Sequence, residues 1–195
     1  MGYKFKRTEI INWLIDKGTY KKYLEIGVNK PRRNFNLIKI ESKVGVDPGV
    51  EGVSRATYTM TSDEFFEQNT ENFDIVFVDG LHEASQVYRD IVNSLNVLNE
   101  GGVIVCHDMN PPSELHQKVP RQSRSWNGDC WKAFVRLRME RDDLEMCVID
   151  DDCGLGIIRS GTQKILKNEE LTYENLDKNR KDWLNLVSVE EFYCR

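Results

Sequence analysis

Two short apolar segments, each ending in an acidic residue beside a glycine turn, constrain the fold of this chain more than any other feature. They are 23-YLEIGVN-29 and 43-KVGVDPG-49. Glu25 and a single glycine, Gly27, end the first segment, and Asp47 ends the second about twenty residues later. This order is typical of a doubly wound α/β sheet that holds a nucleoside at the carboxyl ends of its first two strands.

Asp47 is the best candidate for a contact with the nucleoside. A carboxylate at the end of the second strand can accept hydrogen bonds from both ribose hydroxyls. The alternative is an Asp that only starts the Asp-Pro-Gly turn. Because the first loop lacks the three glycines of a dinucleotide fingerprint, we expect a ligand without a pyrophosphate.

Further titratable residues follow two buried strands in the middle of the chain. Residues 73–78 are almost continuously apolar, which predicts a central parallel strand buried on both faces, and Asp79 and His82 follow it. The next predicted strand ends in His107 and Asp108. Since the carboxyl ends of parallel strands converge on the ligand crevice, we expect these side chains to meet near the reacting group.

Two carboxylates and an imidazole in one place can perform two kinds of chemistry. They can remove the proton of a hydroxyl nucleophile as a general base, or hold a divalent cation that lowers the pKa of the hydroxyl. We expect His82 to be the base, with Asp108 orienting it and Asp79 completing the catalytic group. His107 is expected to be structural, because alternation along a strand would point it away from Asp108.

The segment 74–112 joins these features in an order that resembles a known family. One strand ends in Asp-Gly-x-His and the next in His-Asp, as in a branch of the class I S-adenosylmethionine-dependent methyltransferase superfamily. The resemblance spans roughly residues 20–160. It implies the family's Rossmann-like doubly wound sheet, seven-stranded and mostly parallel with one antiparallel strand near the C-terminus, and helices on both faces.

The same resemblance implies an enzyme that moves a methyl group from S-adenosylmethionine to a hydroxyl of a small molecule or glycan. The sulfonium already activates the methyl group, so in-line displacement needs only positioning and removal of the hydroxyl proton. The alternative is a non-catalytic nucleoside-binding domain, or a metal-dependent reaction of another type, because a fold does not fix chemistry.

The resemblance assigns these residues to the cofactor: Glu25, Gly27, Asn29, Asp47, Ser62, Asp63 and Asp79. Glu25 would lie near the methionine amino group, and Gly27 would let the backbone pass the methionine part. Ser62 or Asp63 would accept the exocyclic amine of adenine. Each has a structural alternative: a turn-stabilising carboxylate, an ordinary turn glycine, or a helix cap for the Asn, Ser and Asp.

The resemblance also bears on a metal. Catechol-type O-methyltransferases place an Asp after one strand and an Asp-Asn pair after the next, whereas this chain has Asp108-Met109 and an Asn110 displaced by one residue. Asp79 and Asp108 are therefore the candidate ligands for magnesium or calcium, with His82, Asn110 or water completing the shell.

Composition bounds the partners and the compartment. The chain has 27 basic and 32 acidic residues among 195, a net charge of −5, which argues against a nucleic-acid partner. The N-terminus lacks the apolar core of a signal peptide, and no apolar run is long enough to span a membrane. Five cysteines without CxxC spacing indicate reduced thiols, so we expect a cytoplasmic protein. The oligomeric state is left open.

The chain divides into a methyltransferase-like domain, residues 1–165, and a helical appendage, residues 166–195, packed on it. A short strand is expected at 56–60. Two further strands, at 144–149 and 155–158, are expected to form a hairpin.

The segment 126-WNGDCWKAF-134 has two interpretations. In the first, Asp129 caps a following helix and Trp131 is buried. In the second, Trp126 and Asn127 form a wall or a hydrogen bond for a sugar or aromatic acceptor.

Overall fold

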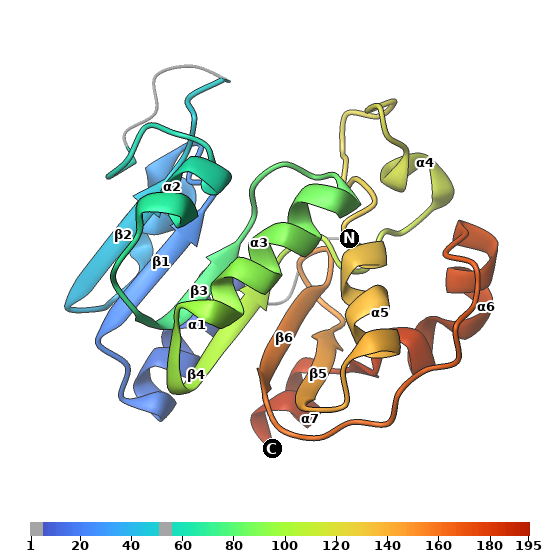
Figure 1. The fold of residues 1–195 in the computed structure, drawn as a ribbon. Helices are drawn as coiled ribbons and strands as arrows, with labels where there is room; N and C mark the ends of the chain where they lie inside the picture. The colour runs from blue at the N-terminus through green and yellow to red at the C-terminus, as the bar shows by residue number, and fades with distance from the viewer. Residues whose placement is uncertain (1–5, 51–55) are drawn as a thin grey trace.

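The computed structural model describes residues 6–50 and 56–195, which form one mixed sheet with helices on both faces (Figure 1). The strands are Lys22–Ile26 (β1), Ser42–Val46 (β2), Phe73–Val78 (β3), Leu98–Cys106 (β4), Leu144–Ile149 (β5), Leu155–Ser160 (β6) and Leu186–Val187 (β7). Their order is β2-β1-β3-β4-β6-β5-β7. Only β6 runs antiparallel to its neighbours. The expected doubly wound α/β class is confirmed.

Helices cover the two faces of the sheet with separate apolar clusters. The helices are Arg7–Gly18 (α1), Pro31–Arg33 (η1), Phe35–Leu37 (η2), Ser62–Gln68 (α2), Ala84–Asn96 (α3), Glu114–Gln117 (α4), Trp131–Glu140 (α5), Tyr173–Leu184 (α6) and Val189–Tyr193 (α7). On the near face in Figure 1, α3 and α5 bury Ile91 and Phe134 against the sheet. On the far face, Leu14 of α1 and Phe192 of α7 belong to the second cluster. Because both faces are covered, the central strands are apolar throughout, as their sequence predicts.

Gly27 ends β1 at a point where two backbones come close. Its φ is +89°, and a Cβ added to it would lie 2.1 Å from the carbonyl oxygen of Asp79. Only glycine tolerates both this conformation and this approach. The turn after β1 therefore packs directly on the turn after β3, which brings the ends of these two strands together.

Two local predictions from the sequence are wrong. Residues 56–60 form no strand, and Tyr58 makes only a single parallel bridge to Val46. Asp129 does not cap α5; its Oδ1 accepts a hydrogen bond at 2.7 Å from the backbone N of Ala84 and so caps the start of α3. A short polar side chain can cap whichever helix start is near it in space, and sequence alone gives only the nearest one along the chain.

The C-terminal segment contributes a strand as well as helices. β7 pairs with β5 and completes the sheet, with Leu186 opposite Val148. Before it, α6 packs on α5, where the Trp131 and Trp183 rings lie 6.2 Å apart and Nη1 of Arg138 donates to the carbonyl of Trp183 at 2.9 Å. The hairpin predicted from β5 and β6 is confirmed.

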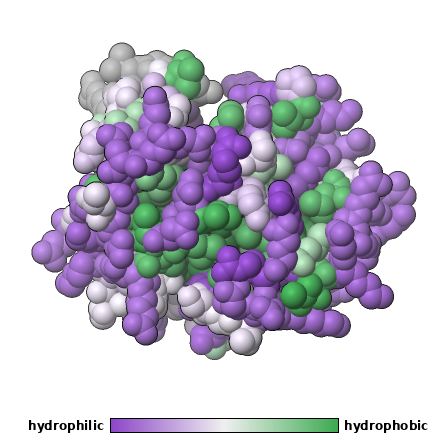
Figure 2. All heavy atoms as spheres, viewed as in Figure 1, coloured by the Kyte–Doolittle hydropathy of each residue, from purple (hydrophilic) through white to green (hydrophobic). Residues whose placement is uncertain are grey.

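Hydrophilic side chains cover most of the face shown in Figure 2, with smaller apolar areas between them. Within residues 6–50 and 56–195, no helix is both long enough and apolar enough to cross a bilayer.

Candidate active site

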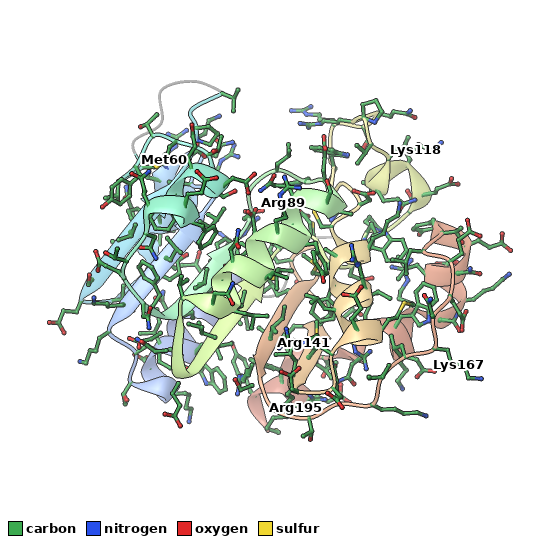
Figure 3. All side chains as sticks on the ribbon, viewed as in Figure 1. Met60, Arg89, Lys118, Arg141, Lys167 and Arg195 are labelled. Carbon is green, nitrogen blue, oxygen red and sulfur yellow. The ribbon has the colours of Figure 1, made fainter. Side chains whose placement is uncertain are left out.

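The carboxyl ends of β1, β3 and β4 lie side by side at the upper edge of the sheet in Figure 1. Figure 3 shows Met60 and Lys118 on either side of this edge, in the loops that follow β2 and β4. The residues that the sequence places after these strands therefore gather at one edge, as doubly wound sheets require.

Asp79, His82 and Asp108 are in mutual contact there. Nε2 of His82 lies 3.5 Å from Oδ1 of Asp79, and Nδ1 of the same ring lies 3.3 Å from Oδ2 of Asp108. The imidazole is thus inserted between two carboxylates, which is the arrangement that can position and charge a base.

His107 joins these residues, and the expectation that it points away from Asp108 is wrong. Its Nδ1 lies 3.0 Å from Oδ2 of Asp108 and 3.2 Å from Oδ1 of Asp79. Strand alternation does not apply, because β4 ends at Cys106 and Asp108 adopts a left-handed φ of +64°. This departure from extended backbone turns both side chains to the same place.

Two residues that the sequence did not single out complete the group. Nη1 of Arg7 donates to Oδ2 of Asp79 at 2.5 Å, and the backbone N and Nε of Arg7 donate to Oδ2 of Asp152 at 2.8 and 3.2 Å. Oδ1 of Asp152 lies 3.5 Å from Nε2 of His107. We call the following six residues the acid–histidine cluster: Arg7, Asp79, His82, His107, Asp108 and Asp152.

Asp152 and Arg7 differ in whether the sequence could have identified them as members of the cluster. Asp152 lies just beyond the end of β5, a strand parallel to β4, so its position at the same edge was a usable signal. Nothing near Arg7 in the sequence marks its contact with Asp79, which lies 72 residues away.

Neighbouring groups of opposite charge offset the effect of burial on the pKa values of the cluster. Burial alone would lower the pKa of His107, but the carboxylates of Asp108 and Asp79 raise it well above its ordinary value. Burial alone would raise the pKa of Asp79, but the charges of His107 and Arg7 hold it well below its usual range. His107 is therefore a cation and Asp79 an anion near neutral pH.

The same balance acts on two further members of the cluster, Asp152 and His82. Burial opposes the ionisation of Asp152, yet His107 and Arg7 lower its pKa to about 2. Burial lowers the pKa of His82, but contact with Asp79 and the charge of Asp108 raise it overall. The raised pKa favours the imidazolium form of His82, and only the neutral form of the ring can accept a proton.

The loop before α5 covers His82. The ring of Trp126 stacks on the imidazole, with centroids 5.2 Å apart and planes 20° apart, and Nδ2 of Asn127 donates to Oδ1 of Asp108 at 2.7 Å. Gly128 has a φ of +64°, and a Cβ there would lie 1.9 Å from the carbonyl oxygen of His82. Trp126 and Asn127 thus hold cluster side chains in place.

Asp47 binds the backbone of two turns. Its Oδ2 accepts a hydrogen bond from the N of Asn29 at 2.6 Å, and its Oδ1 accepts one from the N of Gly49 at 2.7 Å. Asp47 therefore does start its own turn, and it also ties the loop after β1 to the end of β2. Each oxygen keeps a second lone pair for a further donor.

Glu25 is bonded to neutral donors on the α1 side of the sheet. Its Oε2 accepts from the Tyr23 hydroxyl at 2.5 Å and from Nδ2 of Asn34 at 2.9 Å, and the residue is 1% exposed. Burial raises the pKa of Glu25 to about 7, although these two hydrogen bonds oppose the rise. These contacts match the structural alternative, a carboxylate that stabilises its surroundings.

Ser62 and Asp63 are held by a side chain of α3. Nε2 of Gln86 lies 3.1 Å from Oγ of Ser62 and 3.0 Å from Oδ1 of Asp63, and donates to both. Neither residue caps α2, because the hydroxyl of Thr61 accepts from the N of Glu64 and fills that position. The two side chains are therefore fixed at the start of α2.

Two sets of side chains in the described part of the chain have the chemistry of metal ligands, and the donor atoms of each set lie within 4.8 Å of one another. The sets are Asp79, His82 and Asp108, and His107, Asp152 and Cys153. In the first set, His82 presents a different nitrogen to each carboxylate, whereas one ion takes one nitrogen. Arg7 and Asn127 hold the remaining carboxylate oxygens. An ion at the first set would therefore have to use one nitrogen of His82 and compete with the contacts of Arg7 and Asn127.

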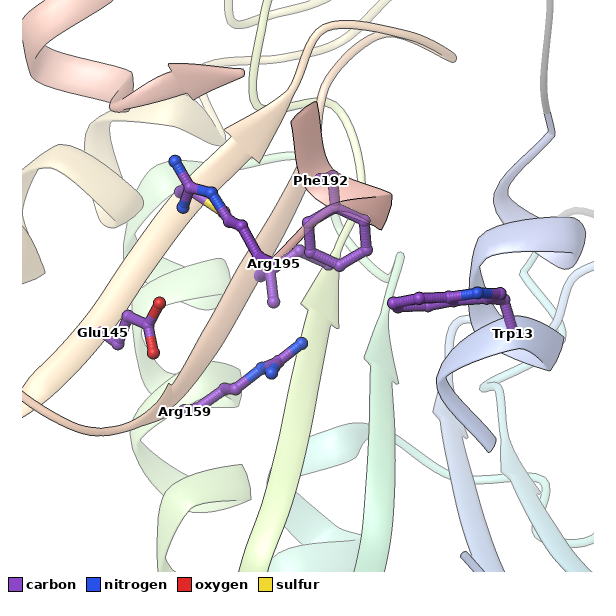
Figure 4. A pocket seen from close by; sticks show the side chains of 7 residues that line it. Trp13, Glu145, Arg159, Phe192 and Arg195 are labelled. Carbon is purple, nitrogen blue, oxygen red and sulfur yellow. The ribbon is translucent and has the colours of Figure 1, made fainter. Parts of the chain in front are cut away.

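A pocket elsewhere in the molecule is separate from this edge (Figure 4). Trp13 of α1 and Phe192 of α7 line it together with Glu145 and Arg159, which face each other where β5 begins and β6 ends. It therefore lies on the α1 and α7 face, toward the opposite edge of the sheet.

Comparison with known proteins identifies the type of domain. A family model described as a methyltransferase domain matches residues 9–109. No curated protein sequence matches the chain significantly.

Solved structures share the fold. The O-methyltransferase TomG from Streptomyces achromogenes, in complex with SAM, is 14% identical, with 79% of each chain covered and a TM-score of 0.57. An O-methyltransferase from Bacillus cereus, in complex with SAH, is 12% identical, with 83% of this chain and 84% of that chain covered and a TM-score of 0.57. The methyltransferase PaMTH1 from Podospora anserina, SAH-bound, is 16% identical, with 80% and 78% covered and a TM-score of 0.56.

Proposed function

Because this chain belongs to the methyltransferase-domain family, we propose that it transfers the methyl group of S-adenosylmethionine to a hydroxyl of a small molecule or glycan. The observation that carries the proposal is the insertion of His82 between Asp79 and Asp108 at the carboxyl edge of the sheet. A hydroxyl acceptor needs a base at the point of transfer, and this imidazole is the group suited to it. Two solved O-methyltransferase structures with this fold, one in complex with SAM and one with SAH, support the same chemistry.

The reaction is an in-line displacement at the sulfonium methyl. The acceptor oxygen forms a bond to the methyl carbon, the bond from that carbon to sulfur breaks, and the hydroxyl proton passes to His82. S-adenosylhomocysteine leaves with the electron pair of the broken bond. The protein supplies orientation and proton removal, since the cofactor itself carries the activated group.

Asp79 and Asp108 orient and charge the base. Two cationic side chains, Arg7 and His107, lower the pKa of Asp79 well below its usual range, so this carboxyl stays ionised. Two carboxylates beside His82 favour the imidazolium that forms when it accepts the proton. Trp126 stacked on the ring restricts its orientation.

Proton removal in this proposal needs no cation between the two carboxylates. The geometry of His82 described above supports a base without metal over a magnesium or calcium site at Asp79 and Asp108. A general base of this kind supplies a rate factor of roughly a hundred to ten thousand.

Cofactor recognition is assigned to the β1 and β2 ends. Asp47 accepts the ribose hydroxyls with the lone pairs left by its two backbone donors. Gly27 and Asn29 form the turn along the methionine part, and Glu25 acts behind that turn. Asp79 borders the cofactor from the next strand.

Adenine is assigned to the start of α2. Ser62 and Asp63 are held there by Gln86, which leaves the second oxygen of Asp63 for the exocyclic amine. Arg89 lies 3.4 Å from that oxygen, so the amine would compete with an exposed ion pair, which is a weak contact.

The domain boundaries and the compartment remain part of the proposal. Residues 1–165 form the methyltransferase unit, and residues 166–195 stabilise it through the packing of α6 on α5. The protein acts in the cytoplasm, where its five cysteines stay reduced.

The test separates an enzyme from a binding module. S-adenosylmethionine should raise the melting temperature of the purified protein, and S-adenosylhomocysteine should accumulate when a panel of hydroxylated small molecules and glycans is added. Stabilisation without product across the panel would favour a nucleoside-binding domain. No stabilisation by the cofactor would contradict both readings.

A further inference from the structure

We propose that His107, Asp152 and Cys153 form a zinc-binding site directly behind the Asp79 and Asp108 carboxylates. One donor atom from each of the three residues lies within 4.8 Å of the others. An imidazole, a carboxylate and a thiolate are all ligands that zinc accepts, and the sulfur selects zinc over magnesium or calcium. Three protein ligands leave a fourth tetrahedral position for water.

The contact between His107 and Asp152 has the spacing of two ligands on one ion. Nε2 and Oδ1 lie 3.5 Å apart, and Nε2 is buried without a hydrogen-bond partner. Two ligands bound at roughly 2.0 to 2.1 Å to a tetrahedral zinc ion lie about 3.4 Å apart. His107 carries a proton in the metal-free protein, so an ion at this point would displace that proton and occupy a buried nitrogen that has no hydrogen-bond partner in the protein.

The surroundings of the two ligands are those of a metal site. A zinc-bound His commonly donates its other N–H to a carboxylate, and a ligating carboxylate commonly accepts hydrogen bonds on its free oxygen. Nδ1 of His107 lies 3.0 Å from Asp108. Oδ2 of Asp152 accepts from both the backbone N and Nε of Arg7, which leaves Oδ1 toward His107.

The backbone holds Cys153 beside His107. The N of Met109 donates to the carbonyl of Gly154 at 3.0 Å, and the N of Asn110 donates to the carbonyl of Cys153 at 2.9 Å. A Cβ on Gly154 would lie 2.4 Å from the N of Asn110, so the two segments are in direct contact. Cys153 forms no disulfide. It is only half-buried, which gives an ion a route in from the surface.

Cobalt(II) distinguishes this site from the other candidate set. Cobalt replaces zinc in tetrahedral sites and absorbs strongly in the near ultraviolet through thiolate-to-metal charge transfer only when a cysteine binds it. The whole chain, freed of metal with a chelator, should bind about one equivalent of cobalt with this absorption, and added zinc should remove it. Cys153→Ser should lose the absorption and weaken zinc binding at least roughly tenfold. Loss of a residue that only hydrogen-bonds to a metal ligand already weakens binding by that much.

Two control variants should keep the absorption. Cys194→Ser removes an exposed thiol far from the cluster in sequence, and His82→Gln removes the imidazole of the other set. Asp108→Asn neutralises the carboxylate behind His107, which also contacts His82, and should weaken zinc binding by roughly ten- to a hundredfold. This variant gives a second measure if Cys153→Ser unfolds. Circular dichroism checks the fold of each variant.

Three results would overturn the site. They are no binding of cobalt, an unchanged absorption in folded Cys153→Ser, and cobalt bound without the charge-transfer absorption. The last result would place the ion at Asp79, His82 and Asp108 instead.

Discussion

The two halves of the carboxyl edge hold their acidic residues in different ways. At the ends of β1 and β2, Glu25 and Asp47 accept hydrogen bonds from neutral donors, which are a hydroxyl, an amide and two backbone N–H groups. At the ends of β3 and β4, Asp79 and Asp108 contact imidazoles, and Arg7 also pairs with Asp79. Each half contains at least one buried carboxylate, but the charges that surround the carboxylates differ.

The difference separates holding a ligand from moving a proton. Neutral donors fix the direction of a carboxylate but compensate its charge poorly, so buried Glu25 has a pKa of about 7. Cationic partners keep Asp79 ionised although it is buried. The first half is therefore suited to positioning a ligand, and the second to stabilising a charge that changes during a reaction.

The largest expected effect comes from removing the proposed base, His82, in the second half. His82→Ala should lower the rate of methyl transfer by roughly a hundredfold or more, while affinity for S-adenosylmethionine changes little. Single-turnover kinetics and calorimetry measure the two quantities. His116→Ala, in α4, is the control and should be near normal. A near-normal rate for His82→Ala would move the base to Asp79 or Asp108.

The next effect tests the neutral donors around Glu25. Between pH 4.5 and about 7 the native carboxyl keeps a proton that the unfolded chain has lost. The free energy of unfolding should therefore fall as pH rises through this window, by up to about 3 kcal/mol. Glu25→Gln should remove this part of the pH dependence of urea unfolding and leave the part due to Asp90, whose pKa burial raises to about 6. Glu67→Gln, at an exposed position, should keep both parts. The same slope in both variants would assign it to other groups.

A smaller effect is expected at Asp47. Asp47→Ala should weaken S-adenosylmethionine binding by roughly 1.5–3 kcal/mol, because the ribose hydroxyls lose a charged acceptor. Calorimetry measures the affinity, and Asp16→Ala, on the exposed side of α1, serves as the control. Unchanged affinity with an intact fold would remove Asp47 from the site.

The smallest effect is expected from hard cations. Since Arg7 and His107 already compensate Asp79, adding magnesium or calcium to chelator-treated protein should change the rate by less than about twofold. A steady-state assay of S-adenosylhomocysteine with and without each ion measures this. Turnover lost on chelation and restored by magnesium would show that the cationic side chains move aside for an ion.

The sequence predicted the fold, and it predicted that Asp79, His82 and Asp108 would meet at one edge of the sheet. Central strands buried on both faces carry a strong apolar signal, and an acid at the end of a parallel strand has only one edge to point to, which is why Asp79, His82 and Asp108 were found. The strand expected at 56–60 depended on a weaker pattern, and only Tyr58 bridges to β2.

The contacts between the strand ends could not be predicted in the same way. The left-handed conformation of Asp108 is set by its surroundings, and it reverses the direction that alternation gives to His107. The charge of a buried carboxylate depends on partners distant in sequence, and Arg7 carries no local mark of the role. Patterns within one segment report which faces are buried, whereas pairings between segments depend on the folded chain.

The contact between Arg7 and Asp152 has a consequence for the order of folding. The two residues are 145 positions apart, so a growing chain has made α1 long before it has made the partner. Contacts of such separation cost loop-closure entropy before they return any energy, so the cluster should form late. Pulse-labelled hydrogen exchange during refolding should find the amides of Met109 and Asn110 protected after those of β1 and β3. Protection at the same time would contradict this order; a late cluster means that a partly folded chain can hold a sheet yet perform no chemistry.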